Sequence, residues 1–241
     1  MNSRAWQIGR IKNVPILVNP STLLMALVLI YFFENRIASW SNTNAYVLGL
    51  VLAIGLYISV LIHELSHMFT AQTFGYRVER ITLHFLGGET LIAHGARKAN
   101  HELWIGLSGP LSSGLIGIVA VVLSFGSSTS DISNLLLVLG SLNLLLALMN
   151  LLPALPLDGG RALRGLVWLL VKDRNKATLF VAFLGRILVI GLLALLVIGY
   201  FNTTYIVTTD IVIAIILGSF IWAGSGSAAA QARSEMNRDY L

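Results

Sequence analysis

The sequence predicts an all-α polytopic membrane protein, with six transmembrane helices and a small membrane-associated β-hairpin or sheet near the candidate active site. Three observations predict this fold class. Of the 241 residues, 56% are hydrophobic and only 11% are charged, so the chain is far more apolar than an ordinary globular domain. Six stretches lack charge, or nearly lack it, over a length that can cross a bilayer. The basic residues gather in the segments on one side of these stretches.

The six uncharged stretches are expected to be six membrane spans. The fifth is interrupted by Arg186, whose side chain we expect either to extend toward the cytoplasm or to pair with a carboxylate. The predicted spans are residues 14–33, 45–74, 103–125, 132–157, 177–201 and 211–232.

The basic residues predict the orientation of these spans. With the N-terminus inside, fourteen Lys and Arg residues lie in cytoplasmic segments and only Arg36 lies in an external loop. This asymmetry follows the positive-inside rule and predicts a multi-pass protein of the cell membrane with both termini cytoplasmic. The net charge of +5 therefore indicates contact with the lipid bilayer and no nucleic-acid partner. The cytoplasmic basic residues are Arg4, Arg10, Lys12, Arg77, Arg80, Arg97, Lys98, Arg161, Arg164, Lys172, Arg174, Lys176, Arg233 and Arg238.

Two segments have the pattern of β-structure. Residues 6–19 alternate partly between apolar and polar side chains, which predicts a short strand leading into the first span. In residues 78–94 the alternation is interrupted by Gly87-Gly88, which predicts a β-hairpin on the cytoplasmic side. Such an element can present an unpaired edge to an extended peptide.

The second span ends in His63-Glu-Leu-Ser-His67, where an apolar run should hold no ionisable group. Such groups at membrane depth are costly and usually functional. Residues i and i+4 share one face of a helix, so His63 and His67 can offer two imidazole nitrogens to one metal ion, with Glu64 as general base. Because the chain has no cysteine, any metal must be held by His, Asp or Glu. The motif predicts a zinc hydrolase site inside the membrane.

The fourth span ends in Asn150-Leu-Leu-Pro153-Ala-Leu-Pro156-Leu-Asp158. Two prolines three residues apart forbid a regular helix, and a broken helix at membrane depth marks a site. Asp158 is expected at a depth similar to that of the histidines, where a third protein ligand would leave the fourth zinc position for water. Two simpler roles stay open: Asp158 as the N-cap of the following helix, and Asn150 as a partner for carbonyls freed at the break.

These motifs together resemble the site-2 proteases, a family of intramembrane zinc metalloproteases. The resemblance spans nearly the whole chain and is carried by 63–67, 85–88 (Phe-Leu-Gly-Gly), 108–110 (Ser-Gly-Pro) and 150–161. It implies one zinc ion per chain bound by His63, His67 and Asp158, with Glu64 as the catalytic base. It also implies that Asn150 helps to hold the substrate carbonyl and that Gly87 and Gly88 belong to the hairpin that binds substrate.

The resemblance is incomplete at two places. The family often has Ala-Gly-Pro followed by Asn, whereas Ser108 stands here for Ala and Ser112-Ser113 follow, which weakens any role that the resemblance assigns to the third span. Members of the six-span branch often carry CBS domains after the last helix. We therefore expect a metalloprotease domain over 1–232 and a short cytoplasmic tail over 233–241, which could begin a linker to such a domain.

The activity implied by the family is hydrolysis of a peptide bond in or near a transmembrane segment of a membrane-bound substrate. Such substrates are single-span regulators or membrane-tethered factors, cleaved in regulated intramembrane proteolysis. The alternative is a membrane metal-ion transporter that uses the His, Glu and Asp cluster as a transport site. A transporter needs further polar residues along a path, and the outer halves of the spans offer almost none. A non-catalytic membrane adaptor is a third hypothesis, which an intact Glu64 disfavours.

Overall fold

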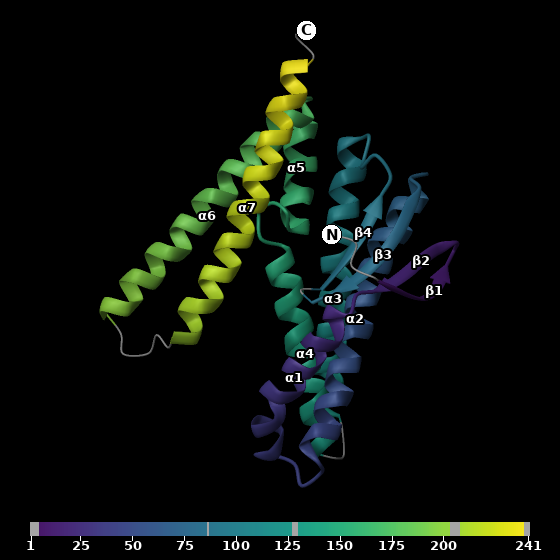
Figure 1. The fold of residues 1–241 in the computed structure, drawn as a ribbon, viewed down its shortest axis with the longest axis vertical. Coiled ribbons are helices and arrows are strands. Elements are labelled where there is room, and N and C mark those ends of the chain that lie inside the picture. Colours follow the sequence, from purple (N-terminus) through teal and green to yellow (C-terminus); the bar gives the residue numbers. More distant parts are fainter. Residues whose placement is uncertain (1–4, 86, 127–129, 203–207, 239–241) are drawn as a thin grey trace. The chain divides into compact units, whose positions relative to one another are not determined.

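A computed structural model describes residues 5–85, 87–126, 130–202 and 208–238 (Figure 1). Within these residues the chain forms two compact units. The first comprises residues 1–96 and 108–149, and the second comprises residues 97–107 and 150–241. The elements in chain order are β1 (Trp6–Ile11), β2 (Val14–Val18), α1 (Ser21–Ala38), α2 (Ala45–Thr73), β3 (Val78–His84), β4 (Gly87–Ile92), α3 (Ala99–Phe125), α4 (Ser130–Asn150), α5 (Asp158–Val171), α6 (Arg174–Asn202) and α7 (Thr208–Arg238).

Every one of these helices except the short α5 is long and apolar enough to cross a membrane, which confirms the six predicted spans. Two predicted boundaries are wrong. The first span was expected from residue 14, but Val14–Val18 pair as β2, so α1 begins only at Ser21. The fourth was expected to reach residue 157, but α4 ends at Asn150 ahead of the two prolines.

The predicted tail at 233–241 is mostly helical, because α7 continues to Arg238. Residues 239–241 of that tail, Leu86 of the predicted hairpin and the basic residue Arg4 lie outside the described residues. Arg186, the cation in the fifth span, lies with its guanidinium carbon 5.3 Å from the ring centroid of Trp222 on α7.

A four-stranded sheet in the first unit confirms both segments of predicted β-structure. The strand order is β1-β2-β3-β4, so β4 is an edge strand (Figure 1). β2 and β3 pair in parallel with Ile16 opposite Ile81, and β3 and β4 form an antiparallel hairpin. The first turn of α1 is attached to this sheet, because the Thr22 hydroxyl donates to the Leu83 carbonyl at 3.1 Å. The sheet is thus attached to the start of α1.

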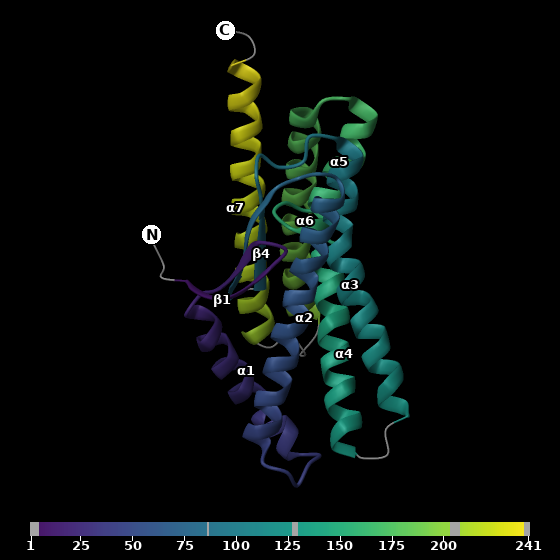
Figure 2. The same cartoon turned by 90° about the vertical axis from the view of Figure 1, so that its right-hand side faces the viewer.

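Helix α2 lies between α1 and α4 in the first unit (Figure 2). Small residues allow the helices to approach closely. A Cβ on Gly49 of α2 would lie 3.4 Å from Ile30 of α1, and a Cβ on Gly55 would lie 3.4 Å from Leu139 of α4. At the contact of α3 with α4, a Cβ on Gly117 would lie 2.9 Å from the carbonyl oxygen of Gly140. Such contacts are typical of helices that pack in a membrane.

The second unit holds the proline-containing loop of residues 151–157 against two helices. The Ser225 hydroxyl of α7 donates to the Leu155 carbonyl at 3.0 Å. Ala154 of the loop is fully buried together with Val189 of α6 and Ile221 of α7. The loop leads directly into α5, so this packing fixes the place at which Asp158 begins that helix.

The second unit also contains a buried ion pair. The Glu102 carboxylate, 3% exposed, accepts a hydrogen bond of 2.8 Å from Nε of Arg164, and Nε of Arg174 lies 3.7 Å from its other oxygen. Burial lowers the pKa of the Arg164 guanidinium, and the Glu102 charge acts in the opposite direction. The pair joins the start of α3 to α5.

We predict that Glu102→Ala strongly destabilises the second unit. The substitution leaves the guanidinium of Arg164 buried and unpaired, which typically costs about 3–5 kcal/mol. Denaturant unfolding of the detergent-solubilised protein measures the change in the free energy of unfolding. Lys176→Ala is the matched control, because it breaks an exposed pair of 3.7 Å with Asp173, which is worth about 0–1 kcal/mol. Equal effects of the two substitutions would contradict the prediction.

Candidate active site

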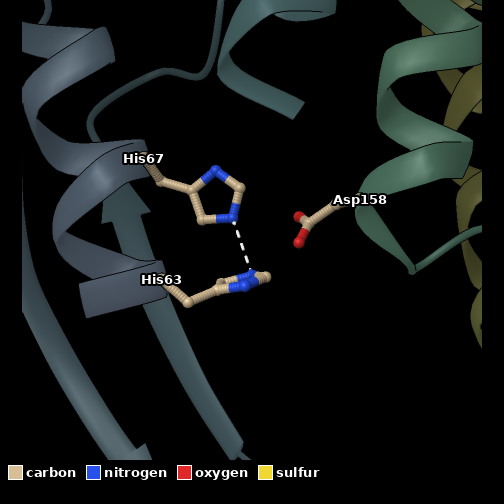
Figure 3. A group of neighbouring side chains, drawn as sticks. All are labelled: His63, His67 and Asp158. Atoms are coloured by element: carbon tan, nitrogen blue, oxygen red, sulfur yellow. Dashed lines mark hydrogen bonds between the residues drawn. The ribbon is translucent and has the colours of Figure 1, made fainter. Parts of the chain in front are cut away.

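His63 and His67 lie one turn apart on the buried face of α2, with 4% and 2% of their surfaces exposed. Their rings are nearly perpendicular, at 76°, and their Nε2 atoms face each other at 3.2 Å (Figure 3). This arrangement confirms the expectation that the i, i+4 spacing brings two imidazole nitrogens together.

The separation of the two nitrogens fits one zinc ion. Tetrahedral zinc binds imidazole nitrogen at about 2.0–2.1 Å, so two such ligands lie about 3.3 Å apart. The distance between the Nε2 atoms, 3.2 Å, agrees with this value. The pair therefore has the spacing of two ligands of a single metal ion.

Gly109 of α3 keeps the space around these nitrogens open. A Cβ at this position would lie 2.5 Å from Nε2 of His63 and closer still to Nε2 of His67. Any residue other than glycine would place a carbon atom directly against both of these nitrogens. The backbone of α3 thus forms one wall of the candidate metal site.

Two serines of α3, the predicted third span, contact the outer nitrogens of the same rings. The Ser113 hydroxyl, fully buried, lies 2.9 Å from Nδ1 of His63. The Ser108 hydroxyl lies 3.3 Å from Nδ1 of His67. No local signal in the sequence singles out these two serines, because the same span also contains Ser112 and Ser124.

Glu64 is buried beside the histidines and contacts strand β4. The Thr90 hydroxyl lies 2.7 Å from Oε2 of Glu64 and 3.1 Å from its backbone carbonyl, so its hydrogen is directed at Glu64. A Cβ on Gly88 would lie 2.5 Å from Cγ of Glu64. Gly88 and Thr90 share one face of β4 because side chains alternate along a strand. Sequence reasoning placed Gly88 near the site and missed Thr90.

Asp158 and Asn150 flank the proline-containing loop of the second unit. Asn150 is the last residue of α4, and Asp158 is the first residue of α5, with 9% of its surface exposed. The alternative in which Asp158 is the N-cap is wrong, because Leu157 occupies that position. Nη1 of Arg161 lies 3.6 Å from Oδ1 of Asp158. Asp158 thus places a largely buried carboxylate at the start of α5.

His63 and His67 of the first unit offer two imidazole nitrogens, and Asp158 of the second unit offers a carboxylate oxygen (Figure 3). Two imidazole nitrogens and one carboxylate oxygen are the donors of a catalytic zinc site, which keeps a fourth position for water. The donor types and the spacing of the imidazoles fit a single Zn²⁺.

We predict that Gly109→Ala weakens zinc binding by about tenfold or more, because the new methyl group would occupy space beside both Nε2 atoms. Alanine favours helix more than glycine does, so the change does not weaken the helix itself. Gly114→Ala on the same helix is the control, since its Cβ would make an ordinary contact of 3.8 Å with Ala147. Zinc content of the two purified variants checks the prediction, and equal zinc in both would refute it.

Comparison with known proteins finds relatives of this chain among the metalloproteases. Residues 51–130 and 113–195 match the profile of peptidase family M50. A curated protein of Synechocystis, whose name provisionally assigns it as a zinc metalloprotease, is 31% identical over 95% of this chain. A zinc metalloprotease of Methanocaldococcus jannaschii is 35% identical over 67% of this chain. The chain spans only 62% and 45% of the lengths of these two relatives.

A solved structure is also similar to the chain. The site-2 protease from Methanocaldococcus jannaschii has a TM-score of 0.62 and 30% sequence identity, over 93% of this chain and 95% of its own. The matched regions include both the His-Glu-Leu-Ser-His segment of α2 and the loop that leads to Asp158. The chain is a multi-pass membrane protein that belongs to peptidase family M50, the family of the site-2 proteases.

Proposed function

We propose that this chain is an intramembrane zinc metalloprotease that hydrolyses a peptide bond in or near a transmembrane segment of a membrane-bound substrate. The observation that carries the proposal is the buried face of α2, where the Glu64 carboxylate stands beside two imidazoles with the spacing of zinc ligands. The names of its relatives favour a metalloprotease over a metal-ion transporter.

In the proposed centre, Nε2 of His63, Nε2 of His67 and the carboxylate of Asp158 hold the metal. Bound zinc supplies Lewis acidity, which makes a coordinated water more acidic and polarises a carbonyl oxygen. Support for Asp158 as the third ligand comes from its low exposure, its oxygen donor and its position in the motif shared with the family.

Glu64 is the proposed general base. Its carboxylate accepts a proton from the attacking water and returns that proton to the leaving amine. The 2.7 Å contact from the Thr90 hydroxyl holds Oε2, while Oε1 lies along the side-chain-free surface of Gly88. The proposed role of Asn150, to hold the substrate carbonyl, is supported by its position at the end of α4, directly before the loop.

The edge of β4 is the proposed binding place for the substrate. A helical substrate has to unwind first, because its carbonyls are occupied by i to i−4 hydrogen bonds. An unwound segment can then pair with the outer edge of β4, which is the last strand of the sheet. Gly88 contacts Glu64, so Gly87 and Gly88 would let an added strand lie close to the base without steric hindrance.

The cellular setting is proposed from the charges and the family. Both termini are cytoplasmic in a cell-membrane protein, as the distribution of basic residues indicates. The metalloprotease domain comprises residues 1–232, and the substrate is a single-span regulator or a membrane-tethered factor cleaved in regulated intramembrane proteolysis.

We predict that Glu64→Gln retains zinc and loses cleavage, because glutamine preserves the shape of the side chain but cannot accept the proton of water. Removal of a general base typically costs about 10²–10⁴-fold in rate. Asp158→Ala should instead lose zinc. The measurements are zinc per purified chain and cleavage of a single-span reporter in detergent. Substantial cleavage by Glu64→Gln, or full zinc in Asp158→Ala, would disprove the role assigned to that residue.

We predict that Gly88→Ala retains zinc but lowers kcat/KM about a hundredfold, the scale expected when a catalytic group moves by 1 Å. The added Cβ would lie 2.5 Å from Cγ and 2.7 Å from Oε1 of Glu64, so the carboxylate has to move. Gly9→Ala in the opposite edge strand is the control, because its Cβ would have no neighbour within 4 Å. Unchanged kcat/KM for Gly88→Ala would argue against β4 as part of the site.

A further inference from the structure

We propose that Ser113 and Ser108 of α3 are positioning residues of the metal centre. Their hydroxyl oxygens accept hydrogen bonds from Nδ1–H of His63 and His67, and thereby hold both rings with Nε2 toward the metal. This inference rests on the proposed function, because it presumes that the two histidines are zinc ligands. It gives the third span a positioning role, and the evidence for that role is the two serine–histidine contacts.

The contact of Ser113 with His63 is fully enclosed by protein. Ser113 has no exposed surface and His63 is 4% exposed, and Oγ and Nδ1 are 2.9 Å apart. A hydroxyl buried in an apolar environment without a partner costs about 1–3 kcal/mol. At Ser113 that cost is avoided because Nδ1 of His63, the ring nitrogen that faces away from the candidate metal site, is its partner.

The tautomer of each histidine decides which atom donates. A neutral imidazole carries its proton on one nitrogen and a lone pair on the other. The Nε2 atoms face each other at 3.2 Å beside the space left by Gly109, so metal binding needs the lone pair at Nε2 of both rings. Each Nδ1 then carries a proton, and each lies near a serine oxygen, at 2.9 Å and 3.3 Å.

The same helix supplies an internal comparison. Ser112, adjacent to Ser113, donates its hydroxyl to the Gly109 carbonyl of its own helix at 2.7 Å. The serines of this span therefore make two kinds of contact. Ser112 forms a hydrogen bond within its own helix, whereas Ser113 and Ser108 contact histidine rings on α2. The shorter and more buried contact of Ser113 should contribute more than that of Ser108.

The test compares the full-length parent with Ser113→Ala, Ser108→Ala and Ser112→Ala in detergent. Competition with a chromophoric chelator measures zinc affinity, the visible spectrum of the cobalt-loaded protein reports ligand geometry, and circular dichroism reports helical content. Loss of a residue that orients a histidine ligand typically lowers metal affinity about 10–100-fold. We expect this loss and an altered cobalt spectrum for Ser113→Ala, a smaller loss for Ser108→Ala, and parental values for Ser112→Ala.

Other outcomes overturn the inference in distinguishable ways. Parental affinity and an unchanged cobalt spectrum in Ser113→Ala would show that the ring needs no serine, while the proposed zinc site stands. Equal loss in Ser112→Ala, or a loss of helical signal in Ser113→Ala, would assign these serines to helix packing. A parent that binds no zinc would overturn both the proposed function and the role of the serines.

Discussion

The structure depends on one constraint: polar side chains placed on the buried face of a membrane-spanning helix must find their partners within the protein. Unsatisfied polar groups are costly in hydrocarbon, and water is not available there to pair with them. On α2 this requirement is met from three directions. Thr90 of β4 contacts Glu64, Ser113 of α3 contacts His63, and Asn143 of α4 donates to Ser59 at 3.2 Å. The neighbours of α2 are therefore arranged around its polar groups as much as around its apolar ones.

The second feature of the site is the absence of side chains at the positions nearest to the reactive groups. Gly88 lies against the Glu64 carboxylate, and Gly109 lies against both imidazoles. In the second unit, Gly159 and Gly160 at the start of α5 lie against the backbone of the preceding loop, where a Cβ at either position would overlap backbone atoms. Glycine permits a backbone to approach this closely, at a cost in conformational entropy that the packing has to offset. Backbone thus lies directly against the Glu64 carboxylate and against both imidazoles.

Sequence reasoning succeeded where the determining interactions are local. The i, i+4 spacing of His63 and His67 is a property of one helix, and the break in the helix before Asp158 follows from the two prolines that it contains. It failed where distant segments decide. Residues 14–18 fit both the predicted strand and the predicted first span, and only their pairing as β2 with β3, some sixty residues away, decides for the strand. The contacts of Ser113 and Thr90 were missed for the same reason, because nothing local distinguishes them from other serines and threonines in apolar segments.

Strand β4 can contact both the proposed base and the proposed substrate. Its side chains and its backbone hydrogen-bonding groups point in different directions. Side chains alternate between the two faces, whereas the backbone N–H and C=O groups lie in the plane of the sheet. Thr90 directs its hydroxyl to Glu64 on one face, while no strand among the described residues pairs with the outer edge of β4. Pairing of an unwound substrate with that edge leaves the contact of Thr90 with Glu64 intact. Glu64, the proposed base, would therefore keep its orientation while substrate binds, so that it could take the proton of a water that attacks the newly added strand.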